Sequence, residues 1–349
     1  MKDLSEEEHF ETIDRPIYED ELAPYLPERI FDSHVHLLRR SDYRSGVNPD
    51  ELPTTAPAPM TEDFTPRELD ETMRRLFPEQ QWEAMVFHHP NSHIDLEKGN
   101  RWIAELGREH SNLHPLFIPT PDIPADTLKE EVKSGEFIGL KPYLSLAPEP
   151  ETGERRVPDF FPKEQMEVAS ELGLAVVLHV PRRGRIADPA NIGDVVNLCE
   201  NHPGARVILA HVGRSYGPYF IEKAIPSFRH LENLYYDVAA LDDTESVEVL
   251  LAKIPHEHVL FASDLPVTLL RGRHLCVNRH CFFLTEEPCP NSITPPPDAE
   301  FAMTFMIYET VRAVLRACRK QDLSDEARDD IFYNNAASLV GEIKEGLER

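Results

Sequence analysis

The chain has 349 residues, and its 36 basic and 62 acidic side chains give a formal net charge of −26. A field of that sign repels polyanions, so we expect no nucleic-acid partner. Apolar residues make up 41% of the chain and charged residues 28%, as in folded globular proteins. No apolar run is long enough to span a membrane. Because the charged start, MKDLSEEEHFETIDR, lacks the apolar core of a secretory signal, we expect a cytoplasmic protein.

Short apolar runs recur along the chain, each followed by a polar loop and an amphipathic stretch. Most runs are continuously apolar, which is typical of parallel strands that are covered on both faces. Strands that alternate with helices indicate βαβ units, and eight such units favour a closed barrel over an open sheet. The eight predicted strands span 29–33, 84–87, 113–118, 137–141, 174–178, 206–210, 234–238 and 259–262.

Helical signals separate these strands. Thr65, followed by Pro66 and Glu68, predicts an N-cap with proline in the first helical position. The stretch KEQMEVASELG after Pro162 predicts a helix with Gly173 as its C-cap. Further helices are predicted at 95–110, 191–201, 244–253, 301–320 and 324–348.

These elements predict a single α/β domain over residues 1–349. Its fold is a (β/α)8 TIM barrel with a core at about 29–320, an N-terminal extension at 1–28 and C-terminal helices at 321–349. Three proline-rich segments exceed an ordinary βα loop. Because each follows a strand, we expect them at the C-terminal face, where barrel active sites lie. They are 37–62, 145–159 and 265–300.

Residues with ligand chemistry occur at the ends of five predicted strands. His34 and His36 are two positions apart, so a strand directs both imidazoles to the same side. A single histidine at a strand end is more often structural, and one HxH pair is weak evidence. Five strand ends that converge at one barrel mouth are a stronger signal. In chain order they carry His34 and His36, Lys141, His179, His211 and Asp264.

From about residue 29 to its end, the chain resembles the amidohydrolase superfamily. It is most similar to the amidohydrolase-related branch, which includes decarboxylases of the aminocarboxymuconate-semialdehyde type and several lactone hydrolases. The motifs that carry the resemblance are FDSHVHL, GLKPY, VVLHV, ILAHVGRS, YYDVAA, FASDLP and IFYNNAASLV. The resemblance implies that His34, His36, His179 and Asp264 bind a divalent metal. It also implies that His211 contacts the substrate or the attacking water.

Lys141 bears on the number of metals. In binuclear members of the superfamily the lysine on the fourth strand is carbamylated and bridges two metals, and every position needed for that is filled here. The branch that this chain resembles more closely usually holds one zinc beside an unmodified lysine, so we expect one Zn²⁺. The same ligands also accept manganese, iron and cobalt. An unmodified Lys141 would orient a substrate carboxylate or Asp264.

Arginines are concentrated after the fifth, sixth and eighth predicted strands. Seven arginines and no Asp or Glu occur within 180–187, 212–221 and 265–285. Because arginine binds carboxylate and phosphate bidentately, we expect a small anionic substrate, with carboxylate favoured. The alternative is that these arginines pair with carboxylates elsewhere on the acidic surface. The residues expected to bind the substrate are Lys141, Arg182, Arg214, Arg271 and Arg273.

The segment 265–300 also contains two histidines and three cysteines. Their spacing includes no C-x-x-C pair, so we expect a lid with packed or free side chains rather than a second zinc site. The total of five cysteines, an odd number, predicts reduced thiols rather than a disulfide framework. The residues in question are His274, Cys276, His280, Cys281 and Cys289.

We expect the enzyme to hydrolyse an ester, lactone or amide bond with metal-activated water. Asp264 would accept the water's proton and pass it to the leaving group, and His211 would polarise the carbonyl or hold the water. Non-oxidative decarboxylation of an aromatic or muconate-type acid is the alternative, because the branch uses the same ligands for it. A barrel that binds partners without catalysis is a third hypothesis. The additional N-terminal and loop segments suggest a homodimer.

Overall fold

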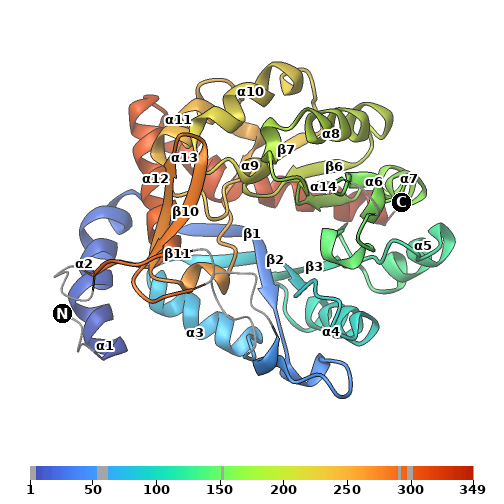
Figure 1. Cartoon of the computed structure of the whole chain (residues 1–349), viewed down its shortest axis with the longest axis horizontal. Coiled ribbons are helices and arrows are strands. Elements are labelled where there is room, and N and C mark those ends of the chain that lie inside the picture. The colour runs from blue at the N-terminus through green and yellow to red at the C-terminus, as the bar shows by residue number, and fades with distance from the viewer. Residues whose placement is uncertain (1–4, 53–61, 151–152, 290–291, 297–301, 349) are drawn as a thin grey trace.

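Eight parallel strands form one sheet in the order β1 to β8, with helices packed outside it (Figure 1). Hydrogen bonds from Ser33 N to Phe261 O (3.0 Å) and from His36 N to Leu265 O (2.8 Å) join β1 to the end of the β8 segment and close the barrel. The predicted (β/α)8 fold is therefore confirmed. This computed structural model describes residues 5–52, 62–150, 153–289, 292–296 and 302–348.

The barrel strands lie close to their predicted positions. The first strand is the exception, because it continues through the HxH pair instead of ending before it. The strands are β1 (Arg29–Leu37), β2 (Gln81–His88), β3 (Leu113–Phe117), β4 (Gly139–Leu140), β5 (Ala175–Leu178), β6 (Arg206–Leu209), β7 (Leu234–Asp237) and β8 (Val259–Leu260).

Two helices of the barrel were not predicted. Helix α5 buries only Leu128 and Val132, which gives a weak periodic signal, and α10 contains Pro226 in its interior. The predicted helix 301–320 begins only at Met306, and residue 301 lies outside the described residues. The helices are α1 (Glu6–His9), α2 (Arg15–Ile17), α3 (Pro66–Leu76), α4 (Leu96–Glu109), α5 (Ala125–Ser134), α6 (Val157–Phe160), α7 (Lys163–Glu171), α8 (Pro189–Asn201), α9 (His211–Arg214), α10 (Pro218–Phe228), α11 (Thr244–Leu251), α12 (Met306–Lys320), α13 (Asp325–Asp329) and α14 (Asn335–Leu347).

The strands are buried on both faces, as their continuous apolar runs predict. Along β5, Ala175 and Val177 belong to one buried cluster, whereas Val176 and Leu178 belong to the other. This double burial fixes the register of each strand, because a shift by one residue would exchange the two faces. No helix among the described parts of the chain is long and apolar enough to cross a membrane.

The segment 265–300 contains a second, three-stranded sheet that was not predicted. Its strands are β9 (Gly272–Val277), β10 (His280–Thr285) and β11 (Ser292–Ile293), and we call β9 and β10 the lid hairpin. The hairpin register places Cys276 opposite Cys281, and the two form a disulfide. The expectation of reduced thiols is therefore wrong for this pair, because a local turn brings the cysteines together. The remaining three cysteines are free.

Candidate active site

The histidines of β1 and the aspartate after β8 meet at the barrel mouth. His34 Nε2 and His36 Nε2 lie 3.5 and 3.2 Å from Asp264 Oδ1. The backbone causes this meeting, because Asp264 N donates to His34 O at 2.9 Å where the barrel closes. Both imidazoles therefore lie on the same side of β1, as their spacing predicts.

Three further strand ends bring their side chains to the same place. His211, at the end of β6, has a ligand atom within 4.8 Å of those of His34 and Asp264. The ring of His179, after β5, lies 5.5 Å from the ring of His211, and Lys141 Nζ lies 3.1 Å from His34 Nε2. All six predicted strand-end residues line one cavity of about 260 Å³. That volume suits a small molecule, since sites for drug-sized ligands span about 300–1,000 Å³.

Asp237 orients two residues of this cluster through hydrogen bonds. It was not predicted as a site residue from the sequence. Its Oδ2 lies 2.9 Å from His34 Nδ1, and its Oδ1 accepts a hydrogen bond from His211 N at 2.7 Å. A carboxylate that accepts from Nδ1–H leaves the lone pair of Nε2 directed at the site, as is typical behind metal-bound histidines. The available signal was its position, because Asp237 ends β7 within the motif YYDVAA.

The histidines have the electrostatic state that a metal site requires. Burial, followed by the charge of Lys141, lowers the pKa values of His34 and His36 well below the usual 6.5. Burial, followed by the charge of Arg214, has the same effect on the pKa of His179. Neutral imidazoles retain the lone pairs that bind a metal. In addition, the buried Nδ1 atoms of His36 and His179 have no hydrogen-bond partner among the described residues. This donor set fits a divalent metal.

Asp264 and Lys141 are two ionisable groups of the site whose pKa values are shifted towards neutrality. Burial raises the pKa of Asp264 to about 6 and lowers that of Lys141 to about 8. Lys141 is fully buried, and its Nζ lies 4.7 Å from the centre of the Phe87 ring. A carboxylate with a raised pKa is suited to proton transfer near neutral pH.

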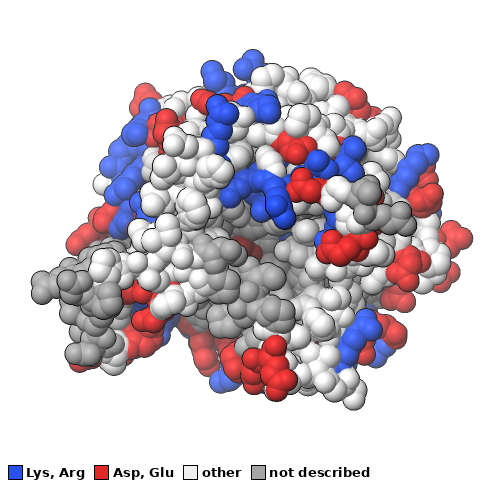
Figure 2. All heavy atoms as spheres, viewed as in Figure 1, with Lys and Arg blue, Asp and Glu red and all other residues white. Residues whose placement is uncertain are grey.

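Two guanidinium groups and two phenols line the wall above this cluster. Arg185 and Arg214 border the cavity, and neither forms an ion pair with a carboxylate among the described residues. Burial raises the pKa values of Tyr143 and Tyr216 to about 12, so both phenols stay neutral hydrogen-bond donors. Figure 2 shows Lys and Arg side chains gathered beside the hollow at the centre of this face. The cavity therefore offers cationic and neutral donors to an anion.

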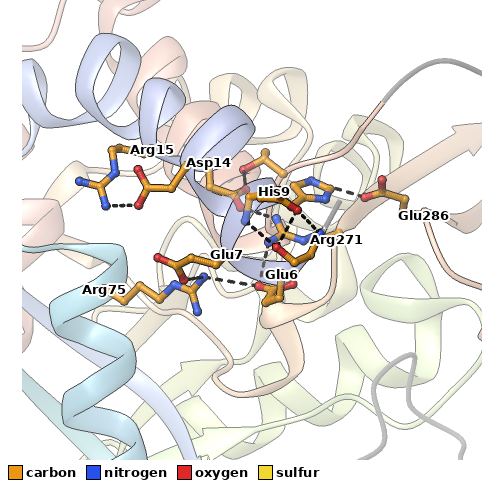
Figure 3. A network of polar contacts seen from close by, with 12 residues as sticks. Glu6, Glu7, His9, Asp14, Arg15, Arg75, Arg271 and Glu286 are labelled. Carbon is orange, nitrogen blue, oxygen red and sulfur yellow. Dashed lines mark hydrogen bonds and ion pairs between the residues drawn. The ribbon is translucent and has the colours of Figure 1, made fainter. Parts of the chain in front are cut away.

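Three of the predicted substrate-binding arginines lie elsewhere. Arg182 pairs with Asp188 at 3.0 Å, and Arg273 lies 3.7 Å from Glu309. Arg271 pairs with Asp14 and Glu6 of the N-terminal extension (Figure 3). None of the three lines the cavity, because carboxylates from other elements bind their guanidinium groups. These contacts match the alternative of surface pairing, so only Lys141 and Arg214 keep their place beside the cluster.

Backbone strain is concentrated around this cavity. Ten described non-glycine residues have positive φ angles, and five of them line the cavity. Strained backbone of this kind gathers at functional sites, where the fold holds it in place. Within the turn that presents two of the five, Gly213 has φ +64°, and a Cβ there would lie 2.6 Å from Ile186 Cβ. The five residues are Arg185, His211, Arg214, Ala240 and Asp264.

The lid hairpin and the end of β2 supply further parts of the cavity wall. His274, Cys281 and Phe283 line the cavity from the hairpin, and His89 lines it after β2. His88 instead lies 3.1 Å from Asp42 and is fully buried. The cysteines and histidines of the hairpin form no metal-type cluster among the described residues.

Comparison with known proteins agrees with this geometry. The family model described as Amidohydrolase matches residues 31–341. No curated protein matches the chain.

Solved structures share the fold at low sequence identity. A probable 2-pyrone-4,6-dicarboxylic acid hydrolase from Acinetobacter baumannii, with citric acid bound, has 11% identity and a TM-score of 0.56, covering 89% of this chain and 99% of that one. A 5-carboxyvanillate decarboxylase from Sphingomonas paucimobilis has 13% identity and a TM-score of 0.55, with coverage of 90% and 99%. A dihydroxybenzoic acid decarboxylase from Polaromonas, with manganese and 2-nitroresorcinol bound, has 13% identity and a TM-score of 0.54, with coverage of 90% and 97%.

Proposed function

Since the chain belongs to the amidohydrolase family, we propose that it is a metal-dependent hydrolase of an ester, lactone or amide bond in a small carboxylated substrate. The observation that carries the proposal is the cluster at the barrel mouth, where the metal ligands assigned below meet His211. Ligand atoms of His34, His211 and Asp264 lie within 4.8 Å of one another, and His36 Nε2 lies 3.2 Å from Asp264 Oδ1. This cluster lies in the same cavity as Arg214 and Lys141. Metal-ligand and anion-binding groups thus line one small site.

We assign one divalent metal, with zinc favoured, to His34, His36, His179 and Asp264. Such a metal supplies Lewis acidity, which makes water a nucleophile near neutral pH. Lys141 stays unmodified in this assignment and directs its charge into the site. Elemental analysis tests the assignment, because two metal equivalents per chain would contradict it. Absence of any bound metal would favour a non-catalytic binding barrel.

The protein's own groups account for the proton transfers. Asp264 accepts a proton from the attacking water and returns it to the leaving group, for which its raised pKa is suited. His211 Nδ1 donates to Ala239 O at 3.0 Å, which leaves Nε2 to contact the substrate or the water. Arg214, with Arg185 beside it, binds the substrate carboxylate.

Decarboxylation of an aromatic acid is the second candidate function. It is favoured by the aromatic side chains Tyr143, Tyr216 and Phe283, which line the cavity and would pack against a planar ring. The same metal ligands and cationic groups would serve this reaction.

Two assays of zinc-loaded protein separate the candidates. Base consumption with 2-pyrone-4,6-dicarboxylate identifies lactone hydrolysis, whereas carbon dioxide release from 2,6-dihydroxybenzoate or 5-carboxyvanillate identifies decarboxylation. Chelation should abolish the activity, and added zinc should restore it. If broad panels of lactones, esters, amides and aromatic acids gave neither signal with metal bound, both proposals would be wrong.

A further inference from the structure

One histidine reaches the cavity from outside the barrel. His274 lies on β9 of the lid hairpin, opposite Phe283 on β10, and both side chains line the cavity. The His274 side chain is 2% exposed. None of the roles proposed above involves His274. The metal-type cluster contains only residues from the barrel strand ends.

Asp242 fixes the orientation of the His274 ring. The Asp242 Oδ2 atom lies 3.1 Å from His274 Nδ1 and accepts a hydrogen bond from His274 N at 2.7 Å. A carboxylate accepts hydrogen bonds, so Nδ1 carries a proton, and in the tautomer that this contact selects Nε2 presents a lone pair. Nε2 is buried and has no hydrogen-bond partner among the described residues. A buried polar atom without a partner destabilises the folded protein, so the site favours a ligand that supplies a hydrogen bond to this atom.

Neighbouring aromatic side chains hold the His274 ring in place beside an arginine that lines the cavity. Tyr216 stacks on His274 with 3.8 Å between ring centres and 11° between ring planes, and the ring of Phe283 lies 4.4 Å away. The guanidinium of Arg185 lies 4.8 Å from the centre of the Tyr216 ring. An acceptor at Nε2 thus borders the same cavity as the donors that suit an anion.

We propose that His274 is a specificity-determining residue, whose Nε2 accepts a hydrogen bond from a hydroxyl group of the carboxylated substrate. This inference rests on the proposed function, since it places the substrate carboxylate at Arg214. Asp242 is a positioning residue that acts through His274. A substrate without the hydroxyl leaves Nε2 unpaired, and a site built around such a hydrogen bond rejects that substrate.

A matched pair of ligands tests the proposal by binding alone. Calorimetry on zinc-loaded protein compares 3-hydroxybenzoate, whose hydroxyl is too far from its carboxylate to bond to it, with benzoate, which has no hydroxyl. We expect His274→Ala to weaken binding of the hydroxylated ligand about 10-fold, the loss of one hydrogen bond, and that of benzoate less than 2-fold. His280→Ala, an exposed histidine on the same hairpin, should change neither. Equal losses for both ligands, no loss, or wild-type protein without preference for the hydroxylated ligand would each overturn the proposal.

Nitrogen NMR of labelled histidines separates positioning from simple packing. In the wild type, His274 should carry its proton on Nδ1, and 3-hydroxybenzoate should shift the Nε2 signal while benzoate leaves it in place. Asp242→Asn should mix the two tautomers and reduce the preference for the hydroxylated ligand. An Nε2 signal that 3-hydroxybenzoate leaves unchanged would overturn the role of His274. Absence of turnover with intact ligand discrimination would overturn only the proposed function.

Discussion

In the barrel mouth, side chains from three strands meet, and the ligand atoms of His34, His211 and Asp264 lie within 4.8 Å of one another. At the lid hairpin, by contrast, Arg271, just before β9, and Arg273, on β9, direct their guanidinium groups to carboxylates outside the cavity. Both sets were predicted to serve one site. The strand ends meet because the barrel dictates their position, whereas the loop side chains bind whichever opposite charge lies nearest.

Substitutions in the barrel-mouth cluster should have the largest effect, and the quantity that they lower is turnover. Asp264→Ala and His211→Ala should each lower turnover by about 10²- to 10⁴-fold, because each removes a group that handles a proton or the substrate. Initial rates with the active substrate of the panel measure this loss. The matched controls Asp325→Ala and His110→Ala change exposed residues and should keep full activity. Wild-type turnover in either cluster variant would refute the role assigned to that residue.

The next largest effect is a loss of protein stability, and it concerns Arg271, just before the lid hairpin. Arg271→Ala leaves the fully buried carboxylate of Asp14 without its charged partner, so unfolding free energy should fall by about 3 kcal/mol. Urea denaturation measures this change, and benzoate affinity should stay the same. Arg101→Ala removes an exposed pair with Glu97 and should cost less than about 1 kcal/mol. A selective loss of benzoate binding in Arg271→Ala would place this arginine in the site after all.

The contrast also explains what could be predicted from the sequence. Parallel strands bring their carboxyl ends to one rim, so apolar runs alone locate His179 and Asp264 near each other. Arg271 pairs with Asp14, 257 positions earlier in the chain, and no local pattern indicates that contact. The positioning of His274 by Asp242 is equally non-local, because it depends on how the lid hairpin folds over the barrel. Local chemistry and fold symmetry are thus predictable, whereas contacts between loops are not.

Arg214 should behave in the opposite way to Arg271. Arg214→Ala removes a cavity guanidinium without a carboxylate partner among the described residues, so stability should change little. Affinity for benzoate should fall about 10- to 100-fold, the value of a charged hydrogen bond. Arg183→Ala, in the neighbouring loop with a side chain that is 96% exposed, is the control and should leave affinity within 2-fold. Unchanged affinity in Arg214→Ala would contradict its carboxylate-binding role. The cavity arginine Arg214 would then not differ from Arg271 in its effect on binding.

The smallest expected effect concerns a contact between residues that are close in sequence, which contrasts with the long-range pair of Arg271 and Asp14. Helix α3 begins at Pro66 as predicted, and Glu68 accepts hydrogen bonds from the backbone and hydroxyl of Thr65. Thr65→Ala should therefore cost about 1 kcal/mol of unfolding free energy at pH 7. Hydrogen bonding to Thr65 lowers the pKa of Glu68 below its usual 4.5. Its stabilisation is thus complete above that value and disappears as acid protonates the folded carboxylate.

Urea titrations of both proteins at pH 7 and in acid measure this dependence. The difference between wild type and Thr65→Ala should shrink as pH falls below about 4.5, where Glu68 gains its proton. Thr127→Ala, which removes a threonine hydroxyl from an exposed position of α5, should show no such pH dependence. A Thr65→Ala cost that stays constant into acid would mean that the hydroxyl acts without the carboxylate. Even this neighbouring pair would then need more than sequence spacing to explain it.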